Sequence, residues 1–273
     1  MKASKAVKHT VEKILSAEIE KDIPGYPYFG VEEFFPEEYY QELLENSKSI
    51  DMKNFRPLSA NYKNRYIYDL NCGENSNEAR NSFESLSDKE TAFWAEFQTV
   101  FLVSGAIKEA FLQKYGEYID FPFAHAIQPQ CRIQRDFKGY KIGPHRDNLD
   151  KIMSVMIYTS DHHDEETMHD HGTALCVPKF GDALKVPLKE GHVGTGDSRH
   201  FNFDEVDIIK TAPAKPNSMF SWAVADRSYH GVTPLKSDKT RHTMAYFMKI
   251  PKHLSRHHKL YGWANFKKTG ENL

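Results

Sequence analysis

The chain has 273 residues, of which 36 are Lys or Arg and 38 are Asp or Glu, and its formal net charge is −2. A balance this close to neutral gives no reason to expect nucleic acid or an anionic membrane as a partner. No run of about 18 apolar residues predicts a transmembrane helix. With 40% hydrophobic and 27% charged residues, the composition predicts one globular domain with a substantial core.

Cysteine usage and the N-terminus indicate the compartment. Cys72, Cys131 and Cys176 are widely separated and form neither a CxxC pair nor a regular framework. We interpret them as reduced thiols of a reducing compartment. The charged N-terminal stretch lacks the continuous apolar core of a signal peptide. Together these features predict a cytoplasmic protein.

The first part of the chain predicts helices. Residues 5–20 and 37–48 carry apolar side chains at helical spacing. Residues 88–116 predict a pair of helices with a break near Gly105. Segment 51–85 is polar and weakly patterned, so we expect mostly loop there.

From about residue 123 the pattern changes to short runs rich in Val, Ile, Tyr and Phe, separated by Gly, Pro, Asn and Asp. Eight such strands without intervening helices predict a double-stranded β-helix, a cupin-like jelly roll, over residues 123–250. Residues 1–122 are expected to form a helical leader on its outer face, and 251–273 a basic, solvated tail. The fold class is thus mainly β with a helical N-terminal part (α+β). The predicted strands are 124–135, 151–159, 173–178, 184–188, 206–211, 218–224, 228–233 and 241–249.

One pair of residues before a predicted strand has a metal-binding pattern. His145 and Asp147 are two residues apart, so an extended backbone points both side chains to the same face. His230, late in the β region, supplies a third ligand. Two histidines and one carboxylate form the facial triad of non-haem Fe(II) oxygenases, which leaves three coordination positions open. The sequence therefore predicts that these three residues bind a catalytic iron.

Other histidines offer weaker alternatives. With 14 histidines, H-x-D arises easily by chance, and a second copy stands at His162 and Asp164. That copy lies in a polar run without strand period, so nothing places both side chains on one face. The histidine-rich segment 162–171 also lacks the fixed spacing of a zinc site, and we interpret it as a loop between two strands. Asp197 and His200 form another loose pair in a predicted loop.

The final predicted strand begins with a candidate carboxylate-binding residue. Arg241 follows His230 by eleven residues, and Thr243 lies on the same face. A guanidinium binds a carboxylate through two parallel N–H bonds, and a neighbouring hydroxyl adds a third. Alone, Arg241 is more typical of a surface arginine at a strand start. Together with the ordered triad, it predicts a site for the distal carboxylate of a diacid.

Taken in order, H-x-D, a long β segment, a histidine and then R-x-T resemble the Fe(II)/2-oxoglutarate-dependent oxygenase superfamily. The similarity is greatest to the prolyl-4-hydroxylase-like branch and its phage and bacterial members. CRIQRDFKGYKIGPHRDN resembles that branch's approach to its H-x-D, and HGTALCVPK resembles a strand that follows it. The resemblance covers about residues 123–250.

This resemblance implies Fe(II) on the triad and 2-oxoglutarate and O₂ as co-substrates, with the C5 carboxylate held by Arg241 and Thr243. The implied reaction is a hydroxylation that releases succinate and CO₂. Gln134 and Tyr140, which lead up to His145, are candidates to bond the C1 carboxylate or a ligand carboxylate. A structural role suits both residues equally, and the same holds for Arg132.

Two other functions remain open from the sequence. One is a cupin-type metal enzyme that needs no 2-oxoglutarate, and the other is a jelly-roll module that binds a sugar without catalysis. For the oxygenase, the prime substrate is expected to be a small molecule or a modified biopolymer.

Overall fold

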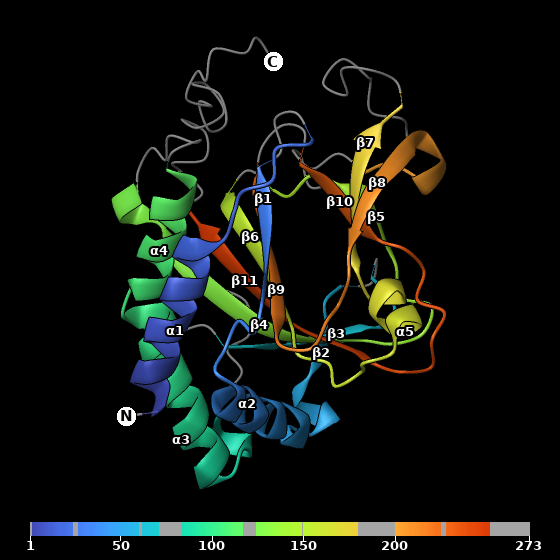
Figure 1. Ribbon diagram of the computed structural model, residues 1–273. Helices are drawn as coiled ribbons and strands as arrows, with labels where there is room; N and C mark the ends of the chain where they lie inside the picture. Colours follow the sequence, from blue (N-terminus) through green and yellow to red (C-terminus); the bar gives the residue numbers. More distant parts are fainter. Residues whose placement is uncertain are drawn as a thin grey trace.

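The computed structural model describes residues 2–23, 27–59, 62–70, 83–116, 124–148, 150–179, 200–224 and 228–251. Two antiparallel sheets, of seven and four strands, face each other (Figure 1). The larger sheet runs in the order β1 (Tyr28–Glu32), β9 (Ser218–Ala223), β6 (Lys151–Tyr158), β11 (Arg241–Lys249), β4 (Gln128–Asp136), β3 (Arg65–Asp69) and β2 (Arg56–Pro57). The smaller sheet runs in the order β5 (Ile142–His145), β10 (Tyr229–Val232), β7 (Thr173–Pro178) and β8 (Val206–Ala212).

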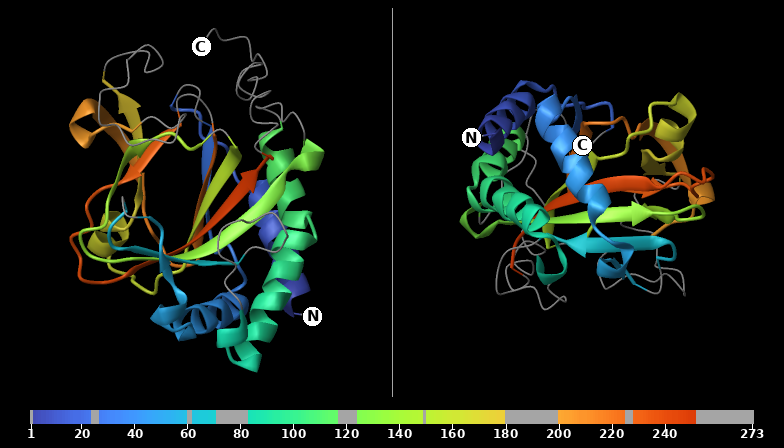
Figure 2. Two further views of the ribbon diagram at one scale, coloured as in Figure 1. Left: turned by 180° about the vertical axis from the view of Figure 1, so that it is seen from behind. Right: turned by 90° about the horizontal axis from the view of Figure 1, so that it is seen from below.

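The helices lie mainly on the outer side of the larger sheet, away from the smaller one (Figures 1 and 2). None of the described helices is long and apolar enough to cross a membrane. The α-helices are α1 (Lys2–Ser16), α2 (Glu37–Ser49), α3 (Asp88–Phe97), α4 (Ala106–Tyr115) and α5 (Glu165–Asp170), and a π-helical segment (Gln98–Val103) joins α3 to α4.

Strand β11 shows how one sequence serves both faces of the larger sheet. Met244 and Tyr246 pack outward with residues of α1, α3 and α4 in the main hydrophobic cluster. Ala245 and Phe247 point inward to a second cluster between the sheets. Because alternate residues of a strand point to opposite faces, Arg241 shares the inward face of Ala245 and Phe247. The inner space of the jelly roll therefore receives an arginine from the sheet's central strand.

The predicted double-stranded β-helix with a helical N-terminal part is confirmed. The predicted helices and the break at Gly105 are also found, and Gly105 adopts the left-handed region at φ 77° immediately before α4. The predicted strand at 184–188 and residues 252–273 of the tail lie outside the described residues.

Two segments that are predicted as mostly loop or as a loop contain short regular elements that the sequence pattern does not predict. Segment 51–85 contains β2 and β3, and β3 extends the larger sheet by pairing with β4, with Arg65 opposite Asp136. Segment 162–171 contains the short helix α5, whose N-cap Asp164 accepts a hydrogen bond from the backbone of Thr167. Strand β1 is a further part of the leader that joins the sheet.

Candidate metal centre and its cavity

The two histidines of the predicted triad lie directly opposite each other on neighbouring strands. His145 ends β5 and pairs with His230 on β10, and the two ring centroids are 4.4 Å apart. The next residue, Gly231, allows this close approach, because a Cβ there would lie 2.8 Å from the carbonyl oxygen of Ile142. A single cross-strand pair thus brings both imidazoles together.

Hydrogen bonds fix the orientation of both imidazoles. In His145, Nδ1 lies 3.0 Å from the carbonyl oxygen of Gly143, and in His230 it lies 3.0 Å from that of Ser228. A carbonyl oxygen only accepts, so Nδ1 carries the proton in each ring. Nε2 keeps its lone pair and is available to a metal, which is the usual arrangement of metal-binding histidines.

Asp147 completes the group and is itself held by two donors. Lys151 Nζ donates to its Oδ1 at 2.5 Å, and Ser154 Oγ donates to its Oδ2 at 2.7 Å. Its Oδ2 also lies 3.7 Å from His230 Nε2. The candidate ligand atoms of His145, Asp147 and His230 all lie within 4.8 Å of one another, and all three residues are buried. This donor set fits one metal ion of the facial-triad type.

The electrostatics of the group favour the protonation states that a metal requires. Burial lowers the pKa of His145 and of His230 below the ordinary value for histidine. Burial on its own would raise the pKa of Asp147, but Lys151 and the two histidines outweigh it and hold this pKa below its ordinary value. Neutral imidazoles and an ionised carboxylate are the forms that bind metal. The group therefore needs no proton rearrangement to bind a cation at neutral pH.

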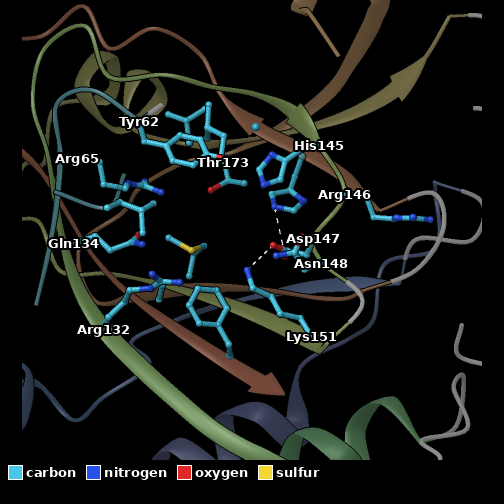
Figure 3. Close-up of a pocket in the computed structure, with 18 of the residues that line it drawn as sticks. Tyr62, Arg65, Arg132, Gln134, His145, Arg146, Asp147, Asn148, Lys151 and Thr173 are labelled. Carbon is cyan, nitrogen blue, oxygen red and sulfur yellow. Dashed lines mark hydrogen bonds and ion pairs between the residues drawn. The ribbon is translucent and has the colours of Figure 1, made fainter. Parts of the chain in front are cut away.

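A cavity of about 390 Å³ opens beside the group, between the two sheets. In Figure 3, Arg65 lies above Gln134 and Arg132 on the left of the cavity, and His145 lies above Asp147 and Lys151 on its right. Among the described residues, the charged side chains of its lining are five cations and one carboxylate: Arg65, Arg132, Arg146, Lys151, Arg241 and Asp147. This lining suits anionic molecules.

Arg241 lies at one end of the cavity and is fully buried. Its Nη1 donates to Asp136 Oδ2 at 2.8 Å, and its Nε donates to the carbonyl oxygen of His171 at 2.5 Å. Its Nη2 has no hydrogen-bond partner within the described part of the chain. A buried donor of this kind needs an acceptor, and a carboxylate bound in the cavity would supply one.

A second arginine shares the same carboxylate. Arg65 on β3 donates to both oxygens of Asp136 at 2.6 Å, and its guanidinium lies 4.1 Å from the centroid of the Tyr140 ring. Asp136 is fully buried between Arg65 and Arg241. The carboxylate therefore positions two guanidinium groups at the same end of the cavity.

Of the other predicted binding residues, one lines the cavity and two lie behind its lining. Gln134 lines the cavity, and its Oε1 accepts from Thr243 Oγ1 at 3.2 Å. Thr243 and Tyr140 are fully buried but are not among the described residues that line the cavity. Thr243 orients Gln134, while Tyr140 supports Arg65.

The residues of the alternative histidine pairs that the structure describes are not part of the candidate metal-binding group. His162 and Asp164 belong to the segment of α5, where Asp164 caps the helix and pairs with Lys239. His200 stacks on His145 with ring centroids 5.0 Å apart, although it is not part of the group with metal-binding distances. Its predicted companion, Asp197, lies outside the described residues.

Sequence reasoning missed three charged residues that surround the site: Arg65, Asp136 and Lys151. Arg65 lies in a segment that is polar and weakly patterned, so no local signal identifies it. Asp136 did carry a signal, since period two along β4 places it on the same face as Gln134 and Arg132. Lys151 opens the strand after the H-x-D motif, where it is an ordinary residue at a strand start.

The fold and the buried group together define a double-stranded β-helix with a facial His-Asp-His site. No protein-family model and no curated protein matches the chain. Solved structures match its fold. A prolyl 4-hydroxylase from Phytophthora capsici aligns with a TM-score of 0.51 and 15% identity over 90% of this chain and 66% of that one. A prolyl hydroxylase from Trichoplax adhaerens, in complex with a hypoxia inducible factor peptide fragment, aligns with a TM-score of 0.50 and 11% identity over 94% of this chain and 93% of that one.

The chain therefore has the fold of these prolyl hydroxylases, and it carries a buried His-Asp-His group of the facial-triad type. The resemblance inferred from the motifs is confirmed for the fold.

Proposed function

We propose that the protein is an Fe(II)- and 2-oxoglutarate-dependent dioxygenase that hydroxylates an unactivated C–H bond of its prime substrate. The main support is the geometry of His145, Asp147 and His230, whose ligand atoms lie within 4.8 Å of one another beside a cationic cavity. Both imidazoles already present Nε2 to the same position, which fits Fe(II). Bound iron would supply the redox chemistry that couples decarboxylation of 2-oxoglutarate to oxidation of the substrate.

The protein's own residues bind the co-substrate and orient the groups around it. Arg241 offers its unpartnered Nη2 to the distal carboxylate of 2-oxoglutarate, and Asp136 holds the guanidinium in place. Gln134, oriented by Thr243, presents its amide to the same cavity. Ser154 and Lys151 hold the carboxylate of Asp147. These contacts pre-organise the site before the co-substrate enters.

The test is turnover of 2-oxoglutarate by the purified protein with Fe(II) and oxygen, read as succinate. We expect succinate to form slowly even without the prime substrate, and formation to stop in Asp147→Ala. His162→Ala serves as the matched control because it removes an H-x-D histidine outside the cavity. Iron binding without any succinate would favour a cupin-type enzyme that does not use 2-oxoglutarate.

A further inference from the structure

The cavity has two cationic ends. At one end, Arg241 and Arg65 converge on Asp136. At the other end, Arg132 and Lys151 approach the same aromatic ring: the Arg132 guanidinium lies 4.8 Å from the centroid of Phe247, and Lys151 Nζ lies 3.9 Å from it. Cation–π contacts of this kind keep each charged group beside the ring. The side chains of Arg132, Lys151 and Phe247 all line the cavity.

One 2-oxoglutarate molecule is too short to occupy both ends. Arg132 and Asp136 are four residues apart on β4, which corresponds to about 13 Å along the strand at about 3.3 Å per residue. Arg132 also reaches away from Arg241, because its strand partner is Ala245 whereas its guanidinium lies over Phe247, two residues further on. The five-carbon diacid held at Arg241 therefore leaves the Arg132 end to another molecule.

The position of Lys151 relates this second end to the metal. Its ammonium is 2.5 Å from Asp147 Oδ1, and its side chain is only 13% exposed. A metal cation bound by Asp147 would draw on the negative charge of the same carboxylate, so that the carboxylate would balance the charge of the Lys151 ammonium less well. A largely buried ammonium is costly without an anionic partner. An acidic group bound over Phe247 would again neutralise the Lys151 ammonium.

Arg146 differs from these two cations, although it also borders the cavity. Figure 3 shows its side chain extending away from the centre, whereas Arg132 and Lys151 both lie at the lower part of the cavity. The inference concerns Arg132 and Lys151 alone.

We propose that Arg132 and Lys151, on the ring of Phe247, bind the acidic group of a small carboxylate- or phosphate-bearing prime substrate. This inference rests on the proposed function. Because Lys151 also contacts Asp147, the oxidised carbon lies within a few bonds of the acidic group. The apolar side chains of Met156, Ala245 and Trp222, which line the cavity, contact the rest of the substrate.

The direct test uses inorganic phosphate as the probe. The full chain is loaded with Mn(II) and 2-oxoglutarate, and paramagnetic broadening of the phosphate signal is followed by phosphorus NMR. We expect broadening in the wild type, binding about tenfold or more weaker in Arg132→Met, and partial recovery in Arg132→Lys. Lys210→Met is the matched control, since it removes a cation over the ring of Tyr28 outside the cavity.

The outcomes separate this inference from the function on which it rests. Failure of Mn(II) to bind overturns the proposed function as well. Mn(II) binding without phosphate broadening, or equal broadening in Arg132→Met, overturns the acidic-group site alone. A rise in the KM for 2-oxoglutarate in Arg132→Met as large as that in Arg241→Lys would assign this end to the co-substrate and also overturn it.

A second arm distinguishes the two kinds of acid. Succinate release is compared for matched pairs: amino acids against their amides, and sugar phosphates or nucleotides against their neutral counterparts. We expect the acidic member of one class of pair to stimulate release and its neutral member not to, with the stimulation lost in Arg132→Met. Stimulation by neutral members alone would refute the proposal.

Discussion

The two H-x-D motifs of this chain have the same spacing but different structures. His145 and Asp147 are 9% and 5% exposed, and His145 is part of an antiparallel ladder with His230. His162 and Asp164 lie at the N-terminus of α5, where the Asp164 side chain is 47% exposed. The first pair has a third candidate ligand and a cavity beside it, whereas the second has a helix cap and a surface ion pair. The motif therefore indicates a site only when a neighbouring strand supplies the remaining donor.

Removal of any ligand of the first copy tests this distinction with the largest expected effect. We expect His145→Ala, Asp147→Ala and His230→Ala each to lose Fe(II) binding. The loss should exceed the about ten- to hundredfold that removal of a supporting outer contact costs. The circular dichroism spectrum should remain that of the wild type, because the hydrophobic clusters do not depend on the metal. Wild-type affinity in all three variants, measured by metal titration, would contradict the assignment.

Arg241 contacts the surroundings of both H-x-D motifs. It lines the cavity beside the first motif, and its Nε donates to the carbonyl oxygen of His171 at the end of α5, the helix that begins at the second motif. Arg241→Lys keeps the charge but loses the planar fork. We expect the KM for 2-oxoglutarate to rise about ten- to a hundredfold, as for loss of hydrogen bonds to a charged group. Fe(II) affinity should stay at the wild-type value.

The control for this titration is Arg56→Lys, which alters an ion-paired arginine that does not line the cavity. A KM for 2-oxoglutarate that is the same in Arg241→Lys and Arg56→Lys would count against Arg241 as the carboxylate-binding residue.

Ser154 tests the contacts that support the first copy, because its hydroxyl donates to Asp147 Oδ2 inside the protein, whereas Asp164 is held by contacts at the surface. Ser154→Ala should weaken Fe(II) binding by about tenfold, the lower end of the range for outer contacts, since Lys151 still holds the other oxygen. Metal titration measures this, with Ser160→Ala as the control because, within the described ranges, its hydroxyl bonds the backbone of His242 and no ligand residue. An effect of equal size in both variants would point to general destabilisation.

The smallest effect on activity is expected for the second copy. The double variant His162→Ala with Asp164→Ala should keep iron binding and 2-oxoglutarate turnover. Loss of the N-cap of α5 should lower the free energy of unfolding by about 0.5–2 kcal/mol, measured by denaturant titration. Loss of iron from this variant would mean that the second H-x-D motif, and not the first, binds the metal.

Local patterns predicted most of the β core, because it depends on spacing within single strands, and they also pointed to the three residues that the fold brings together, His145, Asp147 and His230. His145 and Asp147 needed only period two, and the second copy could be set aside because its surroundings lack that period. The same patterns could not identify Arg65. Strand propensity depends strongly on neighbouring strands, and β3 becomes a strand by pairing with β4, which is distant in the sequence. Likewise, the shared contact of Arg65 and Arg241 with Asp136 is a property of three strands together.

The pairing of His145 with His230 has a consequence for folding fidelity. A slip of one residue between β5 and β10 would turn one histidine to the opposite face and separate the two rings. A metal ion would then bind only the molecules in which this ladder has formed in the correct alignment. By mass action, its binding would increase the population of that alignment over all others. Metal content would thus measure how much of a preparation has reached the native strand pairing, independently of any assay of catalysis.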